Sequence, residues 1–208
     1  MKDNKKIVIV GAGTAGYVTA LILKAKFEET IDITIIKSKD IGIVGVGEGT
    51  TEHWTEFLKY TKIKPELMIK ECGATFKAGI MFQGWGTKNY LHNVNGDYGY
   101  YSGQENLSYL KSMIDDKLIT NKGSLDNLIS KETVPRGYHF DTFKLNKFLE
   151  KTSKERNIKL IDDVIEKVVI STKGITSIQS KDKEYRADLF IDCTGFKKVL
   201  IKGIKVNK

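Results

Sequence analysis

The chain has 208 residues, of which 40% are hydrophobic and 29% are charged, which is the composition of a globular protein with a substantial core and excludes a disordered chain. Its net charge of +8 rests on lysine, because only Arg136, Arg156 and Arg186 among the 34 basic residues are arginine, so we expect no nucleic-acid partner. No apolar run approaches the roughly 18 residues of a membrane span, and MKDNKK leads directly into IVIVGAG without a signal-peptide pattern, so we expect a cytoplasmic protein without membrane contacts.

The first elements of the chain are a strand, a glycine turn, a helix and a second strand. Lys6–Val10 is a short β-branched run, typical of a strand buried on both faces. Apolar residues then recur at helical spacing to about Phe27, and Ile31–Ile36 is a second β-branched run. This order predicts a right-handed βαβ unit in a parallel sheet, and therefore an α/β fold.

The glycine turn between the first strand and the helix has the pattern GxGxxG. Gly11 permits a tight turn, Gly13 lets the backbone approach a pyrophosphate, and Gly16 lets the helix pack closely. Thr14 and Ala15 complete the turn, and the helix N-terminus offers free N–H groups and a positive dipole to phosphates. The motif in this context favours an FAD or NAD diphosphate over a glycine turn without a ligand.

The end of the second strand departs from an ordinary NAD site. An acidic residue at this position would accept hydrogen bonds from the adenosine ribose hydroxyls, but the position is occupied by Lys37. A lysine cannot accept a hydrogen bond from a hydroxyl. The adenosine end is therefore held differently, for example by Asp40 or by backbone groups, or a phosphate is involved at Lys37.

The middle of the chain contains a second candidate site. Ala74–Phe82 alternates as one strand and places Lys77 on the same face as Gly79, although a strand lysine is more often a solvated edge residue. Glu48 lies in a glycine-rich loop and has the same two interpretations, a functional residue or a solvated one. A loop carboxylate is usually just solvated. Residues 84–134 are rich in Gly, Asn and Tyr, which indicates an insertion rather than more of the core sheet.

The last third of the chain returns to regular elements. Phe143, Leu145, Phe148 and Leu149 mark an amphipathic helix, followed by a short strand at 159–161. The stretches 164–171, 175–180 and 184–187 predict a small antiparallel meander, and 188–192 predicts another buried strand, followed by Cys193-Thr194-Gly195.

Metal and disulfide chemistry find no support in the sequence. Cys72 and Cys193 are far apart and form no CxxC pair, so we expect two reduced thiols. The histidines, His53, His92 and His139, do not have the spacing of metal ligands, so we expect no metal site.

Five motifs in order resemble the flavin-dependent tryptophan halogenase family: GAGTAG, DIGIVGVGEGTTEHW, ECGATFKAGIMF, YHFDTFKLNKFL and DLFIDCTGF. The resemblance runs across essentially the whole chain. It implies a glutathione-reductase-like FAD-binding Rossmann fold with the small β meander and an added substrate-side segment. Residues 1–208 would then be a single FAD-binding domain, with 84–134 as the inserted segment.

The resemblance also implies roles for individual residues. Lys77 corresponds to the lysine of the family's FKxxIxF strand, which holds hypohalous acid or becomes a haloamine and delivers electrophilic halogen to an aromatic carbon. Val46, Gly47 and Glu48 would belong to a strap between the flavin and substrate sites. The stretch from Asp192 to Gly195 would approach the ribityl and phosphate end of the flavin. Gly11, Gly13, Thr14, Ala15, Gly16 and Lys37 would complete the cofactor site.

The implied reaction uses FAD that a separate flavin reductase supplies in reduced form, with O2 and halide as co-substrates and tryptophan or a similar electron-rich aromatic as acceptor. Family members are more than twice as long as this chain, and their GWxWxIP motif and a downstream glutamate have no counterpart here. We therefore expect an incomplete fold, for which a complementary C-terminal chain is a candidate partner. A non-catalytic flavin-binding fragment, truncated or split, and a flavin monooxygenase are the alternatives.

Overall fold

The computed structural model describes residues 4–43, 47–51, 53–77, 79–84, 89–93, 137–172 and 174–203. The chain divides into two compact units, unit 1 with residues 1–46 and 142–208, and unit 2 with residues 47–141. The expected single domain with an insertion at 84–134 stays a prediction, because most of that insertion lies outside the described residues.

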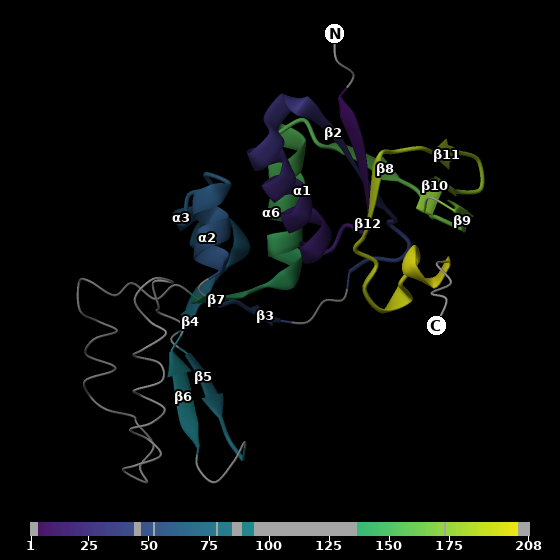
Figure 1. Ribbon diagram of the computed structural model, residues 1–208. Coiled ribbons are helices and arrows are strands. Elements are labelled where there is room, and N and C mark those ends of the chain that lie inside the picture. The colour runs from purple at the N-terminus through teal and green to yellow at the C-terminus, as the bar shows by residue number, and fades with distance from the viewer. Residues whose placement is uncertain are drawn as a thin grey trace. The chain divides into compact units, whose positions relative to one another are not determined.

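Unit 1 is built on a four-stranded sheet in which every neighbouring pair is parallel, as the β-branched runs predict (Figure 1). The strand order is β12-β1-β2-β8. The predicted βαβ unit is confirmed, because the first strand, the glycine turn and the helix lead into an adjacent parallel strand. The strands are β1 (Lys5–Val10), β2 (Ile31–Lys37), β8 (Lys159–Asp162) and β12 (Leu189–Asp192).

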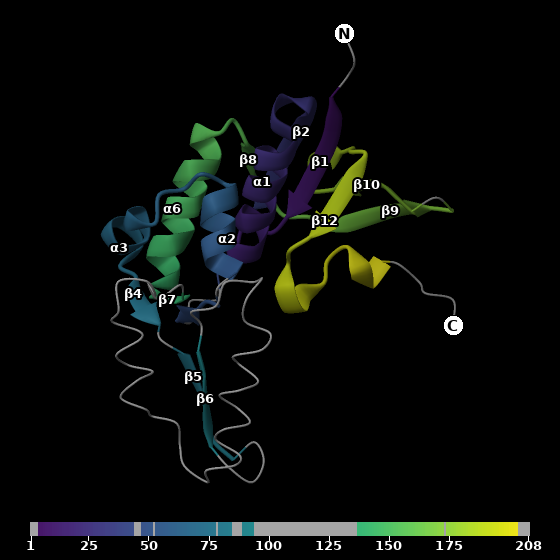
Figure 2. The same ribbon diagram turned by 60° about the vertical axis from the view of Figure 1, so that its left-hand side comes forward.

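Both faces of this sheet are covered, by two helices on one side and by the predicted meander on the other (Figure 2). Val8 and Val10 pack with Ile178 and Leu200 on the meander side. Because side chains alternate along a strand, Ile7 and Ile9 point to the helix side, and both are buried. The covering elements are α1 (Thr14–Phe27), α6 (Thr142–Glu155), β9 (Lys167–Ser171), β10 (Gly174–Gln179) and β11 (Glu184–Tyr185).

Short 3-10 turns complete unit 1, after α1 and after β12. They span Glu28–Thr30, Gly195–Lys197 and Ile201–Gly203. The predicted amphipathic helix is α6, whose Leu145 and Leu149 are fully buried, whereas Phe143 is exposed. Phe143 therefore does not belong to the buried face of this helix, whereas the other three predicted residues do.

Unit 2 holds a three-stranded antiparallel sheet in the order β3-β7-β4, a separate hairpin of β5 and β6, and two helices. The expected single strand over 74–82 is wrong, because 75–77 and 79–82 form strands in different sheets. The first pairs with β7, more than fifty residues away, and the second with the nearby β6. Alternation along the chain does not reveal such a change of partner. The elements are β3 (Glu48–Gly49), α2 (His53–Tyr60), α3 (Glu66–Cys72), β4 (Thr75–Lys77), β5 (Gly79–Phe82), β6 (Tyr90–Asn93) and β7 (Gly137–Phe140).

Two global features bear on the expectations from sequence. Within the part of the chain that the structure describes, no helix is long and apolar enough to cross a membrane. Cys72 and Cys193 are both free thiols, as predicted. Burial raises the pKa of the Cys72 thiol to about 12, so this side chain stays protonated and unreactive at neutral pH.

We predict that Ser153→Ala stabilises the protein. The side chain of Ser153 on α6 is fully buried, and its Oγ has no hydrogen-bond partner among the described residues. Removing a buried, unpaired hydroxyl should raise the free energy of unfolding by about 1 kcal/mol, which corresponds to roughly 2–4 °C in thermal midpoint. The neighbouring Thr152→Val is the control, because the Thr152 hydroxyl donates to Phe148 O at 2.9 Å and its loss should lower the midpoint. A drop in midpoint for Ser153→Ala would contradict the assignment.

Candidate functional site

The glycine turn lies at the carboxyl edge of the parallel sheet, where β1 has β2 on one side and β12 on the other. Gly11 follows β1 with φ 108° and donates its N–H to Ile36 O at 2.9 Å, and Cys193 donates to Val10 O at 2.8 Å. The ends of three strands therefore meet at this turn. In open parallel sheets, ligands bind outside the carboxyl ends of the strands where the strand order reverses.

The three motif glycines have different surroundings. A Cβ on Gly11 would lie 2.3 Å from Cys193 O, and a Cβ on Gly16 would lie 2.0 Å from Gly11 O, so neither position has room for a side chain. A Cβ on Gly13 would meet nothing within 4 Å. Gly11 and Gly16 are thus required by the packing of the turn itself, whereas the open space at Gly13 suits the approach of a ligand.

The start of α1 fits the diphosphate of a dinucleotide. Gly13 precedes the helix without a side-chain cap, and the first turn contains no acidic residue. Thr14 and Ala15 begin the helix, and Ala15 is exposed. The first turn of α1 therefore presents backbone N–H groups and the positive end of the helix dipole beside Gly13, an arrangement that favours an anion there.

The turn after β12 is held by the Asp192 carboxylate. Its Oδ1 accepts from Thr194 N at 3.0 Å and from Thr194 Oγ1 at 2.5 Å, and its Oδ2 accepts from Leu200 N at 2.8 Å and Ile201 N at 3.2 Å. Burial opposes ionisation of Asp192, but these hydrogen bonds outweigh it and lower the pKa. Asp192 therefore positions its own loop, and Gly195 in that loop has open space where a Cβ would be.

Lys37 at the end of β2 is ion-paired with a residue that the sequence analysis missed. Its Nζ lies 2.8 Å from Glu150 Oε2, which also accepts from Tyr17 Oη at 3.1 Å, and Lys154 Nζ lies 2.8 Å from Glu150 Oε1. Burial opposes ionisation of Glu150, but the hydrogen bonds from Lys154 and Lys37 prevail and lower its pKa to about 2. The spacing of Glu150 and Lys154 on one helix face is visible in the sequence, whereas their meeting with Lys37 is not.

Lys77 is buried in unit 2, with 9% of its surface exposed, so the expectation of a solvated edge lysine does not hold. It lies on β4 opposite Gly137, while Gly49 on β3 lies opposite His139, and β7 runs between the two strands. A Cβ on Gly49 would be 3.3 Å from Lys77 Nζ and 3.2 Å from His139 Nδ1. The lysine amine thus reaches across β7 to the glycine-rich segment and has His139 as a neighbour.

The side chain before Lys77 lies on the other face of β4 and is an aromatic ring. Phe76 is 51% exposed, and its ring packs against Tyr138, with centroids 5.7 Å apart. Tyr138 stacks in turn on Phe140, whose ring lies 5.1 Å from Trp54. Aromatic rings therefore follow the central strand of the sheet that carries Lys77.

Unit 1 brings together the predicted cofactor residues Gly11, Gly13, Thr14, Ala15, Gly16, Lys37, Asp192 and Gly195, and unit 2 holds Gly47, Glu48 and Lys77. Gly47 is exposed and has open space at its Cβ position, and Glu48 is half-buried on β3. Val46 lies outside the described residues.

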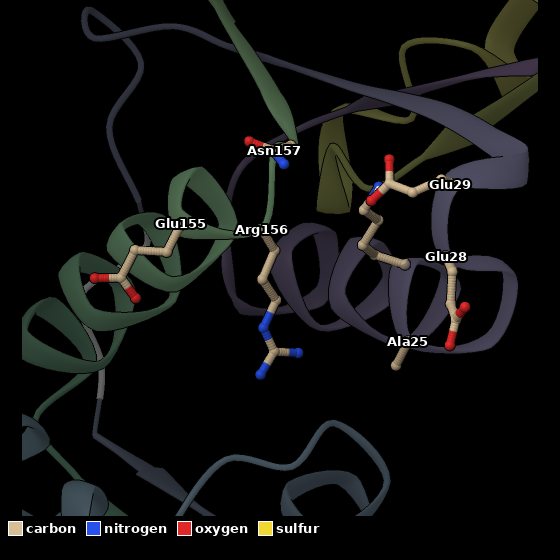
Figure 3. A pocket seen from close by; sticks show the side chains of 7 residues that line it. Ala25, Glu28, Glu29, Glu155, Arg156 and Asn157 are labelled. Carbon is tan, nitrogen blue, oxygen red and sulfur yellow. The ribbon is translucent and has the colours of Figure 1, made fainter.

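A separate hollow of about 400 Å³ lies at the other end of α1 (Figure 3). It is formed where α1 and α6 end, and the guanidinium of Arg156 points into it (Figure 3). Burial lowers the pKa of Arg156. Because α1 has 14 residues and is therefore about 20 Å long, this hollow is distinct from the glycine turn at its start.

The comparisons with known proteins agree with the sequence motifs. The profile described as tryptophan halogenase matches residues 6–207. The chain is 30% identical to the tryptophan 6-halogenase of Streptomyces toxytricini, covering 96% of this chain and 46% of that protein. It is also 30% identical to the tryptophan 7-halogenase of Lentzea aerocolonigenes, covering 98% and 44%. The chain thus spans a little under half the length of these curated relatives.

Solved structures show the same partial coverage. The structure of the Streptomyces toxytricini enzyme superposes with a TM-score of 0.73 at 27% identity, over 97% of this chain and 46% of that one. A tryptophan 5-halogenase gives 0.78 at 25% identity, over 100% and 44%. A flavin-dependent halogenase from Xanthomonas campestris gives 0.74 at 26% identity, over 96% and 44%. The predicted α/β fold is therefore confirmed.

We predict that alanine at Gly13 and at Gly16 has opposite consequences. Gly16→Ala should lower the free energy of unfolding by about 2–3 kcal/mol, because its Cβ would overlap a backbone carbonyl. Gly13→Ala should leave the thermal midpoint within about 2 °C, as its Cβ meets open space, yet weaken FAD binding at least about tenfold by obstructing the diphosphate. Thermal melts and fluorescence titrations with FAD measure both. Unchanged FAD affinity in Gly13→Ala would contradict this placement of the diphosphate.

We predict that Glu150 makes stability depend on pH in the acid range. Its pKa is about 2 in the folded protein against 4.5 ordinarily, so its stabilising effect is complete above about pH 4.5 and is lost as the pH falls toward 2. After allowance for screening by solvent, the effect should be about 1–2 kcal/mol. Urea unfolding of Glu150→Gln should show lower stability than wild type at pH 7, with the gap closing toward pH 2. Glu155→Gln, on the same helix but exposed, should parallel wild type. A constant gap for Glu150→Gln would contradict the ionic role.

Proposed function

Because the chain belongs to the tryptophan halogenase family, we propose that it supplies the FAD site and the halogen-transferring lysine of a flavin-dependent halogenase. When bound and reduced, FAD supplies the reaction of O2 with halide that yields hypohalous acid. A separate flavin reductase is proposed to provide the reduced cofactor, and the cytoplasm is the proposed place of action. The observation that carries the proposal is the buried amine of Lys77 beside Gly49.

Unit 1 supports the cofactor part of the proposal. Gly11 and Gly16 allow the turn to close, Gly13 leaves space for the diphosphate, and Thr14 and Ala15 present the helix N-terminus. Lys37 lies at the adenosine end. The loop that Asp192 holds carries Gly195 toward the same carboxyl edge of the sheet. Val46, Gly47 and Glu48 are proposed as the strap between the flavin and substrate sites, as the family resemblance implies.

Lys77 supports the transfer step. Attack of the neutral amine on hypohalous acid forms an N–halogen bond and releases water. The aromatic carbon of the substrate then takes the halogen from nitrogen without its bonding electrons, and its ring proton is released while the amine is restored. A buried position suits this chemistry, because it limits the competing loss of electrophilic halogen to bulk water. Holding hypohalous acid by a hydrogen bond from Nζ would serve the same transfer.

The acceptor is proposed to be tryptophan or a similar electron-rich aromatic, as in the relatives named tryptophan halogenases. Those relatives are more than twice as long as the matched region. We therefore propose that the substrate pocket also draws on residues that correspond to their second half, in the same polypeptide or in a complementary C-terminal chain.

We predict that Lys77→Met abolishes halogenation and leaves FAD binding unchanged. Methionine fills a similar volume in the buried position but has no amine. The assay combines the protein with the residues that correspond to the second half of its relatives, supplied in the same polypeptide or as a separate chain, and adds FAD, flavin reductase, halide and O2. Mass spectrometry then detects halogenated tryptophan. Lys70→Met, an exposed lysine of α3, is the matched control and should retain activity.

The same assay separates the alternatives. Halogenation that persists in Lys77→Met would overturn the assigned role of the lysine. An oxygenated product that forms without halide would identify a flavin monooxygenase. FAD binding without turnover in the combined wild-type sample would identify a non-catalytic flavin-binding protein.

A further inference from the structure

The end of β2, where the adenosine of FAD is expected, carries no side chain that can accept a hydrogen bond. In a βαβ dinucleotide site, a carboxylate at the end of the second strand accepts hydrogen bonds from the ribose hydroxyls. β2 ends at Lys37, whose ammonium can only donate. Alternation along β2 puts Lys37 on the same face as Ile33 and Ile35, which is the face that the helices cover. The missing acceptor is therefore to be sought on a helix.

Helix α6 brings a carboxylate to this position. Glu150 Oε2 lies 2.8 Å from Lys37 Nζ, with the two side chains only 23% and 22% exposed. One turn earlier on the same helix face, Asn146 Nδ2 donates to Ala12 O in the glycine turn at 2.9 Å. The face of α6 that carries Asn146 and Glu150 thus runs from the glycine turn to the end of β2, the path that a bound adenosine diphosphate would follow.

The Glu150 carboxylate is oriented and retains acceptor capacity. Oε2 accepts from Lys37 and from the buried Tyr17 Oη, while Oε1 accepts from Lys154 alone among the described residues. A carboxylate oxygen can accept two hydrogen bonds, so Oε1 has one position left for a hydroxyl. Asp40, the acidic residue nearest to Lys37 in sequence, is exposed three residues beyond the strand.

We infer that Glu150, positioned by Lys37 and Tyr17, is the acceptor for the adenosine ribose hydroxyls of FAD, a carboxylate supplied from α6 in place of one at the strand end. This inference rests on the proposed function, since it presupposes that FAD occupies the glycine turn. Lys37 is then a positioning residue: it aligns the carboxylate and balances its charge. The same carboxylate would repel a ribose that carries a 2′-phosphate.

The experiment compares FAD with an analogue whose adenosine ribose lacks both hydroxyls. Dissociation constants are measured by flavin fluorescence for wild type, Glu150→Gln, and Glu155→Gln as the matched control on the same helix. Wild type and the control should bind FAD about tenfold more tightly than the analogue, which is the effect of one charged hydrogen bond. Glu150→Gln should lose most of this preference, with little change in its affinity for the analogue.

A second variant guards against a failure to fold. The exchange Lys37→Glu with Glu150→Lys keeps the ion pair, places the carboxylate at the strand end, and should restore the preference for FAD. Equal preference for FAD in Glu150→Gln and wild type would overturn the inference and leave FAD binding intact. Equal weakening of both ligands in Glu150→Gln would also overturn it, because it indicates an effect on the fold alone. Absence of FAD binding to wild type would overturn the proposed cofactor site, and the inference with it.

Discussion

The parallel pairing of β1 on both of its edges is the constraint on which the rest of unit 1 depends. It sets Ile9 beside Ile35 on one side and beside Ile191 on the other, so segments more than 150 residues apart end at the same edge. At that edge the chain must turn within a few ångströms of Cys193, which leaves no room for a Cβ at Gly11. Gly11 and Gly16 are therefore required first of all by the close packing at this turn. Among the three motif glycines, only Gly13 is left with open space, and that is where we propose that the diphosphate binds.

Charge at the same edge is arranged around a carboxylate rather than around the strand-end residue. The Glu150 carboxylate accepts hydrogen bonds from two lysines and a tyrosine, and the two lysines compensate its negative charge in a partly buried position. Asp192, by contrast, uses all of its hydrogen bonds to shape its own loop. Two acidic residues thus have different capacities: Asp192 is saturated by backbone and hydroxyl donors of its own loop, and Glu150 keeps room for a further donor.

In unit 2, the structure holds the amine of Lys77 away from bulk water. Lys77 lies on a short strand whose partner is β7, and its amine reaches past that strand to Gly49. The absence of a side chain at Gly49 is what makes room for the amine, because a Cβ there would press on both Lys77 and His139. The glycine-rich segment and the lysine strand are therefore parts of one local structure, although 28 residues separate them in the chain.

Local pattern by itself determined the βαβ unit, the meander, the last parallel strand and the special position of Gly13, because strand and helix periodicity and glycine geometry are properties of neighbouring residues. Family motifs in the sequence also singled out Lys77. Only the tertiary structure decided which strands pair, and so it broke the expected strand over 74–82 in two. It also decided that Lys77 is buried rather than solvated, although its strand lies at the edge of its sheet. It alone brought Glu150 to Lys37, since 113 residues separate them and no local periodicity links a helix face to the end of a distant strand.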